Sequence, residues 1–152
     1  MMATRNRSIA LFVLSAYIAF VFVQSLFFKF TGSVESIFIF STLRDWSGIG
    51  LFEPFGRFFI GASELVASIL LFVPRTRIFG AGMALGIISG AIVFHLFTPL
   101  GVEIMGDGGL LFTLACGVWI ASAVILWLER AKVAALLSFL RGLAGQRQPM
   151  RM

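Results

Sequence analysis

The sequence predicts an all-α membrane protein in which four membrane-spanning helices form a bundle. Of its 152 residues, 59% are hydrophobic and only 12% are charged, whereas a soluble domain usually has about 25% charged residues. The apolar residues gather in four runs of about 20 residues, the length that a helix needs to cross a bilayer. We therefore expect one compact bundle, with a short interfacial helix on its outer side and an amphipathic helix at its C-terminus.

The ends of the four apolar runs are marked by proline and charged residues. The first run is uncharged from Ile9 to Phe28 and is too long for the apolar core of a signal peptide, so we expect it to remain as a helix. Pro74 ends the second run, Pro99 ends the third, and Glu129 follows the fourth. The predicted helices cover residues 9–30, 55–73, 78–98 and 109–128 of a membrane domain that extends over residues 1–130.

The basic residues predict how the bundle is oriented. One side carries nine basic residues and the single acid Glu129, whereas the other side carries three basic residues and five acids. By the positive-inside rule, both termini are cytoplasmic and the two longer loops face outward, as in a multi-pass protein of the bacterial inner membrane. The net charge of +5 does not indicate nucleic-acid binding, because the basic residues form no clustered face. The nine basic residues are Arg5, Arg7, Arg75, Arg77, Arg130, Lys132, Arg141, Arg147 and Arg151.

Two shorter helices are predicted outside the membrane core. Residues 31–54 are too few and too charged to span a bilayer, and Ser33 can cap a helix that lies in the outer interface. In residues 131–152, apolar side chains recur at helical spacing among basic ones, which predicts an amphipathic helix on the cytoplasmic leaflet, followed by a disordered tail from residue 146. The recurring apolar residues are Val133, Leu136, Leu137, Leu140 and Leu143.

Small residues predict where the spanning helices approach most closely. Gly82, Gly86 and Gly90 are four residues apart and therefore lie on one stripe of the third helix. Inside lipid, close packing of small residues drives helix association, so we expect another helix to lie against this stripe. Ser63 and Ala67 are the corresponding small residues of the second helix. The alternative is that membrane helices simply tolerate glycine.

Four ionisable residues are predicted to lie in the outer half of the bundle. Lys29 ends the first helix, His95 lies one turn before Pro99, and Asp107 opens the fourth helix. Glu64 lies roughly 13 Å inside the second helix at 1.5 Å per residue. A carboxylate at this depth needs a proton or a partner. Lys29 is the predicted partner and Arg57, two turns above Glu64, is a further candidate, in a role that is either structural or functional.

His95 and Asp107 leave several chemical roles open. His95 can carry a proton, donate a hydrogen bond to a quinone carbonyl or bind a metal, although a lone histidine is a weak metal site. We favour a hydrogen bond from His95 to a neighbour such as Asp107. Asp107 precedes two glycines and an apolar run, so we expect it to cap the fourth helix.

The remaining composition limits the chemistry that the chain can perform. Cys116 is the single cysteine, which excludes an intrachain disulfide and a CxxC pair. No nucleophile motif, phosphate loop or metal cluster is present, so we assign no catalytic residue and no metal site. Many of the 18 phenylalanines fall in the outer half, where their rings can hold a quinone or lipid or simply fill the core.

Several motifs together resemble the DoxX-like family of small four-helix membrane proteins. They are Lys29-Phe-Thr-Gly32, Glu64-Leu-Val-Ala-Ser-Ile-Leu-Leu71 followed by Pro74-Arg-Thr-Arg77, Gly90-Ala-Ile-Val-Phe-His95, and Asp107-Gly-Gly. The resemblance covers about residues 9–128. It implies a four-helix membrane fold and a role either in a quinone-linked oxidoreductase, in membrane assemblies that respond to redox or thiol stress, or in assembly of other membrane proteins.

We therefore carry two main hypotheses. The first is an accessory or scaffold subunit of the inner membrane, with no catalytic activity of its own, that binds a membrane-protein partner, a second copy of itself or a lipid. The second is a quinone-linked oxidoreductase subunit in which Glu64 and His95 handle protons. A small transporter is a third possibility, but four helices without a repeat make it the weakest. No cofactor other than a quinone is suggested.

Overall fold

The computed structural model describes residues 2–145 and the side chains of residues 5–143. This part of the chain consists of helices joined by turns and loops and contains no β-strand. Its elements are α1 (Met2–Thr31), α2 (Val34–Ser47), the π-helical turn η1 (Phe52–Gly56), α3 (Arg57–Phe72), α4 (Arg77–Phe97), α5 (Leu110–Leu128) and α6 (Arg130–Gly145). The disordered tail predicted for residues 146–152 lies outside the described residues.

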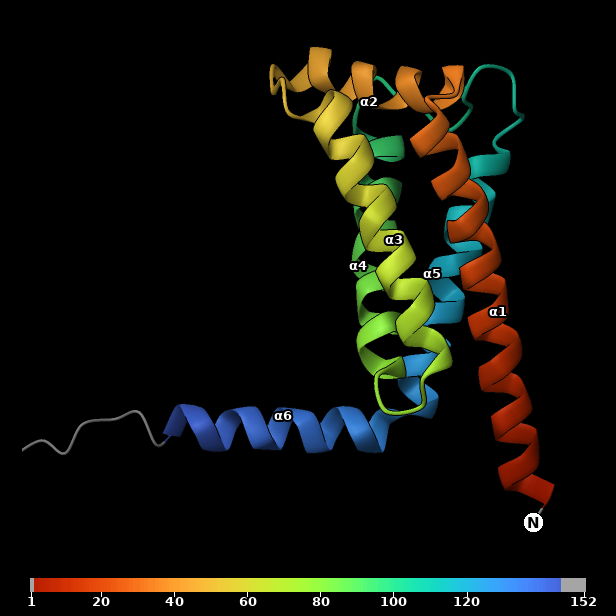
Figure 1. Ribbon diagram of the computed structural model, residues 1–152, viewed down its shortest axis with the longest axis vertical. Helices are drawn as coiled ribbons and strands as arrows, with labels where there is room; N and C mark the ends of the chain where they lie inside the picture. The colour runs from red at the N-terminus through yellow and green to blue at the C-terminus, as the bar shows by residue number, and fades with distance from the viewer. Residues whose placement is uncertain (1, 146–152) are drawn as a thin grey trace, which may run out of the picture.

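Four of these elements form the bundle that the sequence predicts. Helices α1, α3, α4 and α5 run side by side along the long axis of the molecule (Figure 1). Each is long and apolar enough to cross a membrane, if η1 is counted with α3. The first helix is longer than the predicted residues 9–30, because α1 already begins at Met2. No proline or glycine interrupts the residues before Ile9, so the helix extends past the apolar run.

Helix α2 lies across one end of the bundle, which we call the α2 end (Figure 1). Ser33 caps it as predicted, since its hydroxyl oxygen accepts a hydrogen bond from the Ser36 N–H at 3.2 Å. Gly48 closes it in a left-handed conformation at φ 70°, which suits glycine, and its N–H donates to the Arg44 carbonyl at 2.8 Å. The chain then enters α3 through η1.

Helix α6 leaves the opposite end of the bundle, which we call the α6 end, and runs away from it at a steep angle (Figure 1). It is the helix that was predicted after the fourth span. Its large apolar side chains remain exposed on the isolated chain: Leu137, Phe139, Leu140 and Leu143. This apolar surface has no cover within the described part of the protein.

The core lies between the four long helices. Ile18 and Phe22 of α1 pack with Leu71 of α3 and with Val118 and Ile125 of α5, and all five are nearly inaccessible. Large apolar side chains also cover the outside of the bundle, as on Phe20, Phe59 and Ile120. An apolar exterior around a packed interior is typical of helices that face lipid.

The predicted glycine contact is wrong in its position. No described atom outside the local backbone would lie within 4 Å of a β-carbon placed on Gly82, Gly86 or Gly90. The close approach is at Gly80, where a β-carbon would lie 2.8 Å from the Leu71 nitrogen and 2.9 Å from the Ala67 oxygen of α3. The stripe does not face a neighbouring helix, because the side of α4 that packs in the bundle carries Gly80, Ala81, Ala84 and Ile88.

Candidate functional site

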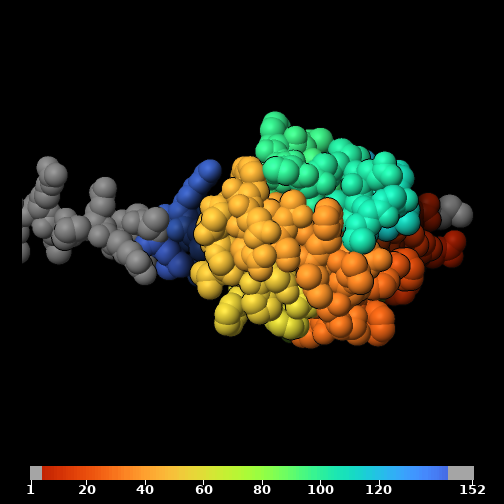
Figure 2. Space-filling view, turned by 90° about the horizontal axis from the view of Figure 1, so that it is seen from above, coloured from red at the N-terminus to blue at the C-terminus, as the bar shows by residue number. Residues whose placement is uncertain are grey.

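A cavity of about 680 Å³ lies at the α2 end of the bundle. Lys29, Glu64, His95 and Asp107, which the sequence places in one half of the bundle, all line this cavity. They reach it from α1, α3, α4 and the loop before α5. In Figure 2, the view from above shows α2 and the loop between α4 and α5 covering this end of the molecule. Six phenylalanines contribute to the wall: Phe22, Phe28, Phe40, Phe52, Phe59 and Phe94.

The predicted ion pair between Lys29 and Glu64 is confirmed. Lys29 Nζ lies 2.9 Å from Glu64 Oε2 and 3.0 Å from Oε1, and the two side chains are only 11% and 5% exposed. The ammonium also donates a hydrogen bond to the hydroxyl of Ser25, one turn earlier on the same face of α1. The pair joins α1 to α3 and removes two isolated charges from an apolar environment.

Arg57 does not belong to this cavity. Its guanidinium lies against Glu53, with Nε 2.9 and 3.0 Å from the two carboxylate oxygens and Nη2 2.8 Å from Oε1. It also donates to the backbone carbonyl of Lys29 and stacks over the ring of Phe58 at 4.5 Å. The partner of Arg57 is therefore Glu53, and the alternative pairing of Arg57 with Glu64 is wrong. Arg57 ties η1 to the end of α1, which is a structural role.

His95 is bonded to a backbone group instead of the predicted Asp107 carboxylate. Its Nδ1 lies 2.5 Å from the Gly101 carbonyl oxygen, so Nδ1 carries the proton and donates it. The other ring nitrogen, Nε2, is then a hydrogen-bond acceptor in the neutral imidazole. The Phe112 ring contacts the imidazole edge-on at 5.6 Å. Gly101 adopts φ 74° in the turn after α4, and this turn brings its carbonyl back to the helix.

Asp107 binds the start of α5, although the N-cap position itself is occupied by Gly109. Oδ1 accepts hydrogen bonds from the N–H groups of Ile104 and Gly109 at 2.8 and 2.9 Å, and Oδ2 accepts one from Leu111 at 2.9 Å. Desolvation raises the pKa of Asp107, but these three bonds and the nearby His95 outweigh it, and the pKa falls below its usual value. The carboxylate thus stays ionised and fixes the loop that carries one wall of the cavity.

We expect Asp107→Ala to destabilise the protein by about 1 kcal/mol at pH 7, since it removes hydrogen bonds to the start of α5. Because the folded pKa lies below the unfolded one, the contribution of Asp107 is present above pH of about 4 and is lost as the pH falls through the folded pKa. Thermal unfolding in detergent should therefore separate the variant from the wild type at pH 7 and bring them together in acid. Glu103→Ala, which removes an exposed acid of the same loop, should have no such effect. A constant difference at every pH would contradict this account.

Two partners in this region escaped sequence reasoning. Ser25 and Glu53 are each four residues before the cation that they bind, Lys29 and Arg57. Spacing of four residues is the local signal that could have found them. Cys116 is half-buried in α5, and the described residues include no group of three or more histidine, cysteine or acidic side chains that could hold a metal ion.

The chain matches no family model, no curated protein and no solved structure. The resemblance to DoxX-like proteins therefore stays a prediction that depends on the motifs alone.

Proposed function

We propose that this chain is an accessory subunit of the bacterial inner membrane that binds an amphiphilic membrane molecule, a lipid or a quinone, in the α2-end cavity. The observation that carries this proposal is the cavity itself. Its volume of about 680 Å³ falls in the usual range for small-molecule sites, which are mostly apolar with few polar groups. We assign the α2 end to the outer face and both termini to the cytoplasm, because seven of the ten basic residues in the described part of the chain lie at the α6 end or on α6.

The charges around the cavity favour a ligand without a strong net charge. Lys29 and Glu64 neutralise each other within 3.0 Å, three backbone N–H groups satisfy Asp107, and Glu35, the remaining acid of the lining, is exposed at the surface. A fully charged ligand would have to break one of these arrangements and leave a buried charge unpaired, which is costly. An apolar molecule with a neutral polar end can instead contact the phenylalanines and form a hydrogen bond with His95 or with the ion pair of Lys29 and Glu64.

A quinone-linked role is the second candidate, and the hydrogen bonding of His95 favours it. The Gly101 carbonyl holds the Nδ1 proton, so neutral His95 offers Nε2 to the hydroxyl of a quinol. A protonated His95 would donate from Nε2 to a quinone carbonyl instead. His95 would then accept one of the two protons that a quinol releases on oxidation, the second would pass to water, and a partner protein would take the two electrons. In this role the chain remains a subunit that binds and positions its ligand.

Glycines on the cavity wall offer a direct test. Gly86 and Gly90 line the cavity, and a β-carbon on either would meet open space. We expect Gly90→Leu and Gly86→Leu to fold normally and to lose most of the co-purifying lipid or quinone, since the added side chain occupies the ligand's volume. Mass spectrometry of the extracted protein after mild purification measures this. Gly82→Leu is the matched control, because Gly82 also has free space but is absent from the lining among the described residues.

The outcome also separates the two candidates. Lipid alone in the wild-type extract supports the accessory role, whereas quinone that is lost in His95→Ala supports the quinone-linked role. Equal ligand content in Gly82→Leu, Gly86→Leu and Gly90→Leu would contradict a ligand in this cavity. A stoichiometric protein partner without any bound small molecule would leave only the scaffold function.

A further inference from the structure

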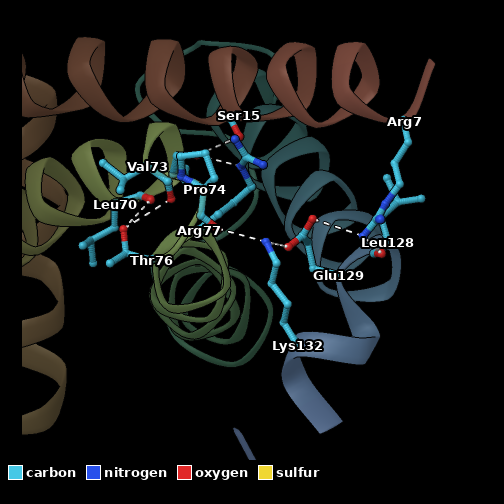
Figure 3. Close-up of polar contacts among 11 residues, drawn as sticks. Arg7, Ser15, Leu70, Val73, Pro74, Thr76, Arg77, Leu128, Glu129 and Lys132 are labelled. Carbon is cyan, nitrogen blue, oxygen red and sulfur yellow. Dashed lines mark hydrogen bonds and ion pairs between the residues drawn. The ribbon is translucent and has the colours of Figure 1, made fainter. Parts of the chain in front are cut away.

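A second cluster of charged residues lies at the α6 end, where Arg7, Glu129 and Lys132 come together (Figure 3). Glu129, the single acid that the sequence places on this side, is only 3% exposed. Arg7 Nη2 lies 3.2 Å from its Oε1, and Lys132 forms an ion pair with its Oε2. Arg7 also donates to the Leu128 carbonyl at 2.6 Å. Glu129 thus holds the start of α1 and the start of α6 against the end of α5.

Beside this cluster is a cavity of about 350 Å³, lined by Arg7, Ser8, Leu11, Pro74, Arg77 and Glu129. It lies where α1, the turn between α3 and α4, and the junction of α5 and α6 come together. Figure 3 shows the Arg77 side chain extending from the turn toward α1. Arg77 Nε donates to the Leu71 carbonyl at 3.0 Å. This bond uses one of its five N–H donors and leaves both terminal nitrogens for other acceptors.

The charges at this site do not cancel. Arg7, Arg77 and Lys132 supply three positive charges, and Glu129 supplies one negative charge that two of them already neutralise. The site therefore keeps an excess of positive charge next to a hollow with an apolar side made by Leu11 and Pro74. Guanidinium groups bind phosphate oxygens through paired hydrogen bonds. Basic pockets between spanning helices bind anionic lipid head groups.

We propose that the α6-end cavity binds a phosphate group, which an anionic phospholipid of the surrounding leaflet presents. Arg77 supplies the main contact, Arg7 the second, and Glu129 keeps Arg7 in place. Helix α6 departs at this point with Leu137, Leu140 and Leu143 exposed and with Arg130 and Lys132 at its start. A phospholipid whose phosphate is bound here would hold the first turn of α6 at the membrane surface. The proposal is separate from the α2-end ligand, since no lining residue is shared.

The test measures lipid binding by the full-length protein with native mass spectrometry in detergent. Phosphatidylglycerol and phosphatidylcholine of equal chain length are compared, and inorganic phosphate is tested separately for thermal stabilisation. A direct hydrogen bond between a guanidinium and a phosphate is charge-assisted, and its loss weakens binding roughly tenfold. We expect the wild type to prefer phosphatidylglycerol, and Arg77→Gln and Arg7→Gln each to weaken that binding about tenfold.

Arg75→Gln is the matched control, because it removes the same charge from an exposed residue of the same turn that is absent from the cavity lining in the described chain. It should leave the lipid preference unchanged. If inorganic phosphate stabilises the wild type against heat but does not stabilise Arg77→Gln, the same site also binds phosphate that is free in solution. Equal binding of both lipids together with no phosphate effect, or an equal loss in Arg75→Gln, would overturn the proposal. If Arg77→Gln fails to fold, the proposal is still tested by the preference of the wild type for phosphatidylglycerol and by the loss of that preference in Arg7→Gln.

Discussion

Replacing Lys29 with methionine is expected to destabilise the protein by roughly 3–5 kcal/mol, the usual cost of removing one partner from a buried ion pair. The reason is that Glu64, whose side chain is 5% exposed, would be left without its cation in an apolar environment. Its short side chain cannot reach water from the middle of α3, so the charge cannot be relieved by a small movement. Glu64→Gln should cost less, because the longer Lys29 side chain lies at the end of α1 and can extend toward the surface.

The double variant Lys29→Met/Glu64→Gln separates this pair interaction from other effects. Removing both charges eliminates the unpaired ion, so the double variant should be clearly more stable than the sum of the two single losses predicts. Thermal and denaturant unfolding in the same detergent measure the three variants. A surface pair gives the control: Arg44 and Asp45 are 2.8 Å apart with side chains 41% and 68% exposed, so Asp45→Asn should change stability by less than about 1 kcal/mol. Additive losses for Lys29 and Glu64 would mean that the two residues are independent.

Replacing Gly80 with valine is expected to have the second large effect, because it forces α3 and α4 apart. A β-carbon at this position would lie 2.8 Å from the Leu71 nitrogen and 2.9 Å from the Ala67 oxygen. Both are backbone atoms, so no side chain can rotate out of the way. The helices are also held together by the short turn between them, where the Arg77 guanidinium binds the Leu71 carbonyl and the Thr76 hydroxyl binds the Leu70 carbonyl. Overpacking in a rigid core costs typically 1–3 kcal/mol and more where relaxation is blocked.

Gly82→Val is the control for this prediction. It lies on the same helix, half a turn further on, and a β-carbon there meets open space. The two variants have the same change in helix propensity and in composition, so a difference between them reports the contact alone. Yield of folded protein and thermal stability in detergent measure it. If both variants are equally stable, α3 and α4 do not pack as described.

Most residues of the candidate site could be found from the sequence, because the requirements that single them out are local. A carboxylate inside an apolar run, such as Glu64, needs a partner however the helices are arranged. Lys29 is the cation that the sequence places in the same half of the bundle. Asp107 binds the start of α5 because aspartate before a helix start can reach free N–H groups within its own turn. His95 lies in the same half of the bundle as Lys29 and Glu64, as the sequence predicts, but its predicted partner Asp107 is wrong. Its bond to Gly101 depends on the left-handed turn of the loop, at φ 74°.

The sequence by itself determined the number of helices long and apolar enough to span a membrane, their approximate ends apart from the start of α1, the two helices outside the bundle, and the end of the molecule where Lys29, Glu64, His95 and Asp107 gather. Each of these follows from hydropathy and breaking residues over short stretches of chain. Only the tertiary structure decided which side of α4 faces α3, that Arg57 binds Glu53, and that two separate cavities lie at the two ends. A helix that is apolar on nearly every side gives no signal of how it is rotated about its axis, and that rotation is set by how all four helices pack at once.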